Sequence, residues 1–178
     1  LMGISFGGYL APRAVAFEKR IKACIANGGV YDFHITAHLT QDLEKYLDTT
    51  KGAEQIDEDI YAKMKINPSL RWAMANGMFT FHAKSPSAWL KMTRPYTMKD
   101  VAAKITCPIL IVDSEEDKDM PGQARMLYNA ITSPRKDFLL FTKEEGAEEH
   151  CQMGAILISN ARILDWLDDI MMKAKKGR

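Results

Sequence analysis

The stretch GISFGGY, residues 3–9, decides how the rest of the chain is interpreted. It fits the pattern G-x-S-x-G, in which a serine occupies a sharp turn between a strand and a helix. Small residues flank the serine because larger side chains would collide in that turn. The pattern predicts that Ser5 is a nucleophile. A glycine-rich turn without chemical function is the alternative, because so short a motif also occurs by chance.

Strands and helices alternate outward from this turn. Three short apolar runs are typical of buried strands in a parallel sheet, at residues 21–26, 108–112 and 138–141. Helical patterns precede, separate and follow them, at residues 9–19, 123–131 and 152–172. In the last helix we expect an apolar stripe formed by Ile156, Leu157, Leu164, Leu167, Ile170 and Met171.

A long helical region interrupts this alternation. It is rich in charged residues and helical periodicity and contains no convincing strand. The sequence therefore predicts an α/β protein with a parallel sheet and flanking helices. The predicted division is a core with the serine turn (residues 1–30), a helical insertion (31–103) and a second part of the core (104–178).

Composition and charge exclude several classes of protein. The 178 residues contain 24 Lys and Arg against 23 Asp and Glu, and no basic run is interleaved with aromatic residues. We therefore expect no nucleic-acid partner. No apolar run approaches the roughly 20 residues of a membrane span, so we expect no membrane partner. Three widely spaced cysteines imply no disulfide framework and favour a reducing, cytoplasmic location.

Charged loops follow the last two predicted strands, where functional residues of a parallel sheet gather. The first loop carries several aspartates, and the second ends in His150. The order serine, acid, histidine is that of a catalytic triad built on a serine turn of this kind. We assign Ser5 as nucleophile, Asp117 as orienting acid and His150 as base. Three other aspartates remain alternatives for the acid: Asp113, Asp119 and Asp32.

Two segments carry a resemblance to a known family. GISFGGYLAPRAVAFEKRIKACIANGGVYDF, residues 3–33, and EEGAEEHCQMGA, residues 144–155, resemble the α/β-hydrolase superfamily. The chain looks like the second half of that fold. The subgroup it resembles carries a helical lid and includes 2,6-dihydroxypseudooxynicotine hydrolase and polyketide-shortening hydrolases of fungal pigment pathways. It is related to esterases and to acylaminoacyl and dipeptidyl peptidases. Ser114 departs from the family pattern, which commonly has glycine there.

The resemblance implies an activity and further site residues. We expect cleavage of a carbon–carbon bond beside a ketone, or of an ester, in a small-molecule carbonyl substrate. Amide hydrolysis, and a folded or binding module without activity, are the alternatives. The backbone N–H of Phe6 is expected to supply one half of the oxyanion hole. Four aromatic residues of the lid would line a substrate pocket or form the lid's own core: Trp72, Phe79, Phe81 and Trp89.

Neither a cofactor nor a metal ion is expected. His34 and His38 have the i, i+4 spacing of a metal-binding pair, but Ile35 occupies the place of the glutamate in a zinc-protease motif. A nucleotide-binding loop at residues 3–8 lacks the spacing G-x-G-x-x-G and would leave Ser5 and His150 without a role.

The resemblance also implies that part of the sheet is missing from these 178 residues. The strand that leads to Ser5 has almost no residues before it, and the second oxyanion-hole donor is expected outside this stretch. We therefore expect the sheet to be completed by a preceding segment of the protein or by a second copy of the chain.

Overall fold

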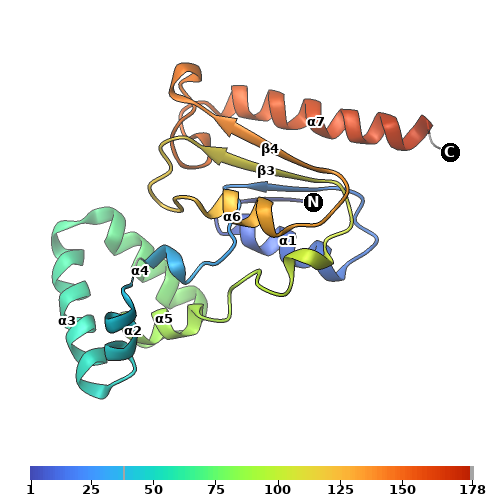
Figure 1. Ribbon diagram of the computed structural model, residues 1–178. Helices are drawn as coiled ribbons and strands as arrows, with labels where there is room; N and C mark the ends of the chain where they lie inside the picture. The colour runs from blue at the N-terminus through green and yellow to red at the C-terminus, as the bar shows by residue number, and fades with distance from the viewer. Residues whose placement is uncertain (38, 177–178) are drawn as a thin grey trace. The chain divides into compact units, whose positions relative to one another are not determined.

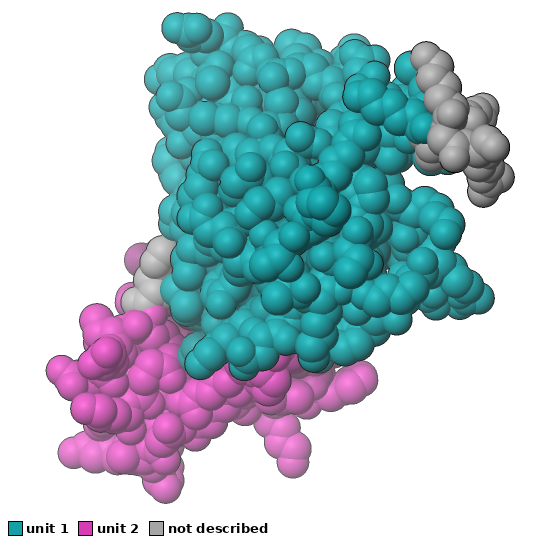
Figure 2. All heavy atoms as spheres, turned by 45° about the vertical axis from the view of Figure 1, so that its right-hand side comes forward, with its two compact units in different colours: residues 1–36, 97–178 teal, residues 37–96 magenta. Residues whose placement is uncertain are grey.

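Two compact units make up the structure, a computed structural model that describes residues 1–37 and 39–176. The first unit joins Leu1–Thr36 to Thr97–Arg178, and the second is Ala37–Tyr96 (Figure 2). The second unit therefore begins a few residues later in the sequence, and ends a few residues earlier, than the predicted insertion at 31–103. In the described part of the chain, no helix is long and apolar enough to cross a membrane.

A parallel four-stranded sheet forms the centre of the first unit. Its order is β1-β2-β3-β4, comprising Met2–Ile4, Cys24–Asn27, Ile109–Ser114 and Lys136–Phe141. In the register, Ile25 lies beside Leu110 and Ile111 lies beside Phe138. Helices α1 (Gly7–Phe17) and α6 (Gln123–Ala130) lie on one face, and α7 (Ile156–Lys176) on the other (Figure 1). The predicted α/β class with a parallel sheet is confirmed.

The two inner strands are apolar because helices cover both of their faces. All four residues of β2 are buried, and Ile109, Leu110, Ile111 and Val112 of β3 are each at most 2% exposed. On the face of α7, Ile25, Leu110, Val112 and Phe141 form a cluster with Ile163. At the sheet edge, Met2 and Ile4 of β1 are 37% and 56% exposed. The expected pairing of this edge with a further strand or a second copy stays a prediction.

Helix α7 differs from its predicted form. It begins at Ile156 instead of residue 152, because Gln152 and Gly154 have φ of 56° and 92°, which no α-helix can contain. Its buried side includes Ile163 and Ile170, whereas Leu157 and Leu164 of the predicted apolar stripe are 87% and 52% exposed. Ile156 and Met171 of that stripe are also exposed, so the prediction was wrong for most of its members.

In the second unit the described residues form the α-helices α2 (Gln41–Leu47), α3 (Thr50–Ile66), α4 (Pro68–Phe81) and α5 (Pro86–Thr93). Each begins after a residue whose side-chain oxygen accepts a backbone N–H of the first turn, namely Thr40, Thr49, Asn67 and Ser85. Proline occupies the first position of α4 and α5, where its missing N–H has no cost. Leu47, Ile56 and Leu90 form the apolar centre of this unit.

Glycines allow the serine turn to pack against the end of β2. A Cβ atom on Gly8 would lie 2.0 Å from the carbonyl oxygen of Gly28, and one on Gly3 would lie 1.9 Å from the carbonyl oxygen of Gly7. These neighbours are backbone atoms, which cannot move aside as a flexible side chain can. By contrast, a Cβ atom on Gly7 would meet nothing within 4 Å. Only some of the glycines in the motif are therefore sterically required.

We predict that Gly8→Ala lowers the free energy of unfolding by about 2–4 kcal/mol, because the added methyl group forces α1 away from β2. The neighbouring control Gly7→Ala should stay within about 1 kcal/mol of the parent protein, because its site is open and helical. Urea unfolding followed by circular dichroism measures both. Equal stabilities of the two variants would contradict the steric account of the turn.

Candidate active site

Ser5 occupies the turn between β1 and α1 with a left-handed backbone, φ 57°. Its N–H donates to the carbonyl oxygen of Asn27 (2.9 Å), and its own carbonyl oxygen accepts from Gly8 N–H (2.7 Å). A non-glycine residue in this region is strained by about 1–3 kcal/mol, and such residues cluster at functional sites. The hydrogen bonds on both sides hold Ser5 at the carboxyl end of β1.

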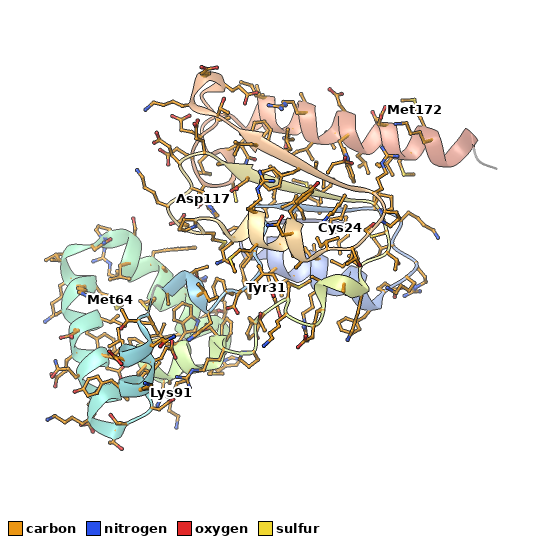
Figure 3. The ribbon with its side chains drawn as sticks, in the orientation of Figure 1. Cys24, Tyr31, Met64, Lys91, Asp117 and Met172 are labelled. Carbon is orange, nitrogen blue, oxygen red and sulfur yellow. The ribbon has the colours of Figure 1, made fainter. Side chains whose placement is uncertain are left out.

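Asp117 lies in the loop beyond the carboxyl end of β3 (Figure 3). Its Oδ1 accepts the backbone N–H groups of Asp119 and Met120, both at 2.9 Å. Its side chain is only 3% exposed. The neighbouring Glu116 N–H donates to the carbonyl oxygen of Glu148 at 2.9 Å. The loop that carries the acid is thus joined by its backbone to the loop that carries His150.

His150 lies in the turn between β4 and α7. The next two residues, Cys151 and Gln152, have left-handed backbones with φ of 53° and 56°. Gln152 is fully buried, and its Nε2 donates to Ser114 Oγ at the end of β3 (2.9 Å). Ser114, the residue that departs from the glycine of the family pattern, therefore anchors the histidine turn to the sheet.

The structure brings Ser5, His150 and Asp117 into one line of hydrogen bonds. His150 Nδ1 lies 2.7 Å from Asp117 Oδ2, and His150 Nε2 lies 2.9 Å from Ser5 Oγ. A ring that donates from Nδ1 to the carboxylate keeps the lone pair of Nε2 toward the serine hydroxyl. This arrangement can remove a proton from Ser5. The assigned roles themselves stay predictions at this point.

The three alternative acids have other neighbours. Asp113 Oδ1 accepts the backbone N–H of Ser114 (3.0 Å), and burial raises the pKa of Asp113. Asp32 Oδ1 accepts the backbone N–H groups of His34 and Ile35, and these hydrogen bonds form a tight turn in the segment after β2. The Asp119 side chain is exposed. Asp117 is the aspartate whose carboxylate meets the His150 ring.

The contact between Asp117 and His150 shifts the pKa of both residues. Burial alone would raise the pKa of Asp117, but its hydrogen bonds with His150 and with the N–H groups of Met120 and Asp119 lower it below the usual range. Burial alone would lower the pKa of His150, but its hydrogen bonds with Asp117 and Cys151 raise it above the ordinary 6.5. Both shifts favour the charged pair that proton uptake from Ser5 would produce.

Three potential metal ligands lie close together at this site. Atoms of Asp117, Asp119 and His150 lie within 4.8 Å of one another. Two of these residues are hydrogen-bonded to each other in the line described above, and the third is an exposed acid. The group therefore gives no independent indication of a metal. Of the histidine pair weighed from the sequence, His38 lies outside the described residues.

Phe6 follows Ser5 at the start of α1. Its ring packs on Phe33 and Tyr9, with centroids 4.4 and 5.9 Å apart. The sequence interpretation missed Phe33, and the available signal was its position shortly after the carboxyl end of β2. It also missed Gln152, whose burial depends on a turn that no local pattern indicates.

The four predicted pocket aromatics divide into two pairs. Phe81 and Trp89 contact each other edge to face, with centroids 6.3 Å apart, and Trp89 packs against the apolar centre of the second unit. Trp72 and Phe79 are 70% and 77% exposed. The first pair thus contributes to the core of the helical unit, and a role of any of the four in substrate binding stays a prediction.

No family model matches the chain. Among curated proteins it is similar to the α/β hydrolase ucsC of an Acremonium species, with 23% identity over 95% of this chain and 39% of that protein. The hydrolase ffsE of Aspergillus flavipes is 30% identical over 96% of this chain and 40% of that protein. The 2,6-dihydropseudooxynicotine hydrolase of Paenarthrobacter nicotinovorans is 21% identical over 99% of this chain and 39% of that protein. The chain therefore spans about two fifths of the length of these relatives.

Solved structures resemble the chain over nearly its whole length. The crystal structure of 2,6-dihydroxy-pseudo-oxynicotine hydrolase gives a TM-score of 0.58 at 21% identity, covering 97% of this chain and 40% of that one. The α/β hydrolase GrgF of a Penicillium species gives 0.61 at 19% identity, covering 97% and 63%. The resemblance found in the sequence is thereby confirmed: the chain is related to the α/β-hydrolases and has the α/β-hydrolase fold.

Proposed function

We propose that the protein is a serine hydrolase in which Ser5 is the nucleophile, His150 the general base and Asp117 the acid that orients it. The observation that carries this proposal is the line of hydrogen bonds from Asp117 through both nitrogens of His150 to Ser5, at 2.7 and 2.9 Å. A binding module without activity would need neither a buried acid behind the histidine nor a strained backbone at the serine.

In the proposed reaction, Ser5 Oγ attacks the carbonyl carbon of the substrate while its proton passes to His150 Nε2. Asp117 stabilises the resulting imidazolium through the Nδ1 hydrogen bond and stays ionised. The carbon–oxygen bond to Ser5 forms as the carbonyl oxygen becomes an oxyanion. His150 then gives its proton to the leaving group as the bond between that group and the carbonyl carbon breaks, which leaves an acyl-enzyme. Water next attacks the acyl carbon while His150 takes its proton, the bond to Ser5 Oγ breaks, and His150 returns the proton to Ser5.

The N–H of Phe6 is the proposed donor to the oxyanion. Phe6 directly follows the nucleophile and is the N-cap residue of α1, at the end of the helix where the N–H groups have no partner within the helix. Removing one donor from an oxyanion hole typically costs about 100- to 1000-fold in rate.

The proposed substrate is a small carbonyl compound cleaved at a carbon–carbon bond beside a ketone, or at an ester. In carbon–carbon cleavage the leaving group is a carbanion, which His150 Nε2 would protonate. In ester cleavage the same proton goes to an alcohol. The curated relative from Paenarthrobacter nicotinovorans carries the name of a pseudooxynicotine hydrolase, and this supports a ketone-bearing substrate by analogy.

We expect a fluorophosphonate probe to label the protein at Ser5, because the probe reacts with serines that an adjacent base activates. Ser5→Ala should abolish labelling and reduce the hydrolysis of p-nitrophenyl esters by several orders of magnitude. The control is Ser69→Ala, at an exposed serine of α4, which should label like the parent protein. Peptide mapping by mass spectrometry locates the adduct. Labelling that persists in Ser5→Ala would contradict the assigned nucleophile.

Asp117→Asn should reduce turnover by about 1000- to 10,000-fold with little change in fold, because an amide in place of the carboxylate no longer fixes the productive form of the imidazole. Asp119→Asn is the matched control, since its side chain is exposed in the same loop, and it should retain turnover within a few-fold. Steady-state kinetics compare the two. A larger loss in Asp119→Asn than in Asp117→Asn would assign the acid differently.

The pH dependence follows from His150. Protonated His150 cannot accept the proton of Ser5, so kcat/KM should fall as the pH falls through the pKa of His150. Because the hydrogen bond with Asp117 raises that pKa, the acid limb should lie above pH 6.5 and move to lower pH in Asp117→Asn. A pH–rate profile over a series of buffers measures it. A flat profile between pH 5 and 8 would contradict a base with the raised pKa of His150.

A further inference from the structure

Two nucleophilic groups lie beside one nitrogen of His150. Ser5 Oγ is 2.9 Å from His150 Nε2, and Cys151 Sγ is 3.3 Å from the same atom. The sulfur is also 3.7 Å from the carbonyl oxygen of Asn27, which accepts the N–H of Ser5. Cys151 thus reaches the catalytic nitrogen and the backbone that holds the nucleophile.

The local backbone directs the thiol to this place. Cys151 has φ 53°, a conformation that costs a non-glycine residue free energy. On the other side, a Cβ atom on Gly28 would lie 3.1 Å from Cys151 Sγ and 3.4 Å from His150 Cε1. The absence of a side chain at Gly28 leaves room for the sulfur and the imidazole together.

We propose that Cys151 is a positioning residue that holds His150 between Asp117 and Ser5 and accepts the Nε2–H of the protonated ring. This inference rests on the proposed function. In the resting state the Nε2 lone pair faces both hydroxyl and thiol, and the hydroxyl is the closer and stronger donor. The thiol can direct its own proton to the carbonyl oxygen of Asn27.

The contact becomes useful when Ser5 attacks the substrate. The proton of Ser5 moves to His150 Nε2, and Ser5 Oγ becomes bonded to carbon and is then a weaker hydrogen-bond acceptor. The sulfur of Cys151 offers lone pairs to Nε2–H until the leaving group takes that proton. The proposed role transfers no proton to or from Cys151, so no oxidant, reductant or additional proton is needed.

In the described part of the chain, the groups placed near His150 come from several loops. Asp117 and Asp119 face it from the loop after β3, Ser5 from the serine turn, and Cys151 from its own turn. The end of β2 contributes Gly28, which has no side chain. The Cys151 contact adds to that of Asp117 in raising the pKa of His150. Removing the sulfur should therefore make the base weaker without removing it.

The test is the rate of fluorophosphonate reaction at Ser5 as a function of pH. In Cys151→Ala we expect the acid limb to move to lower pH by about half a unit or more, and the alkaline plateau to fall about threefold or more, because a weaker base accepts the serine proton less readily. Cys151→Ser keeps an acceptor at this position, and its acid limb should lie between those of the parent protein and Cys151→Ala. For a p-nitrophenyl ester, kcat should change and KM should not.

Cys107→Ala is the matched control. Cys107 is also a free cysteine, but it precedes β3 at the amino end of the strand, away from the site. Its profile should superimpose on that of the parent protein.

The outcomes separate this inference from the proposed function. A parent protein that does not react at Ser5 would overturn the proposed function and this inference with it. If the parent protein reacts, and the pH profiles of Cys151→Ala and Cys151→Ser are both identical to that of the parent, the positioning role is overturned and the hydrolase proposal stays intact. If Cys151→Ala does not fold by circular dichroism, Cys151→Ser decides alone. An acid limb that lies at lower pH in Cys151→Ser than in the parent protein supports the inference, and an acid limb at unchanged pH overturns it.

Discussion

The close approach of two backbone segments at Gly8 and Gly28 is the constraint on which the rest of the site depends. At this point the first turn of α1 lies against the end of β2, where any side chain on Gly8 would overlap the carbonyl group of Gly28. The contact fixes the direction in which the chain leaves β1, and with it the left-handed backbone of Ser5. Gly28 also leaves space for His150 and Cys151 from the far end of the chain. The close packing at Gly8 and Gly28 is therefore required both for the fold and for the arrangement of the site.

Backbone and buried polar contacts join the three loops that carry the site. The loop after β3 and the loop after β4 are connected by the hydrogen bond from Glu116 to Glu148, and Gln152 joins the second loop to Ser114. The serine turn is joined to β2 through Asn27. Because these partners are buried or belong to the backbone, all three loops contribute to the position of His150 between Ser5 and Asp117.

Much of this arrangement could be predicted from the sequence because its causes are local or depend on order alone. Strands β2 and β3 are apolar runs because both faces of the sheet are covered. Ser5, Asp117 and His150 follow from a short motif and from the order of the loops after each strand. The choice of Asp117 over Asp113 was less certain from sequence, since it depends on which backbone N–H groups each carboxylate meets. The start of α7 could not be predicted, because the left-handed turn at Gln152 depends on a distant partner, Ser114. Its buried face was misassigned because apolar residues occupy both sides of the helix, with Ile163 buried and Leu164 exposed.

A crystal structure of the protein after reaction with a fluorophosphonate would show directly whether Ser5 is the nucleophile. We expect a covalent bond between phosphorus and Ser5 Oγ, with a phosphonyl oxygen within hydrogen-bond distance of the Phe6 N–H and His150 Nε2 beside the modified serine. An adduct on Cys151, or a phosphonyl oxygen directed away from the start of α1, would contradict the proposed division of roles at this site.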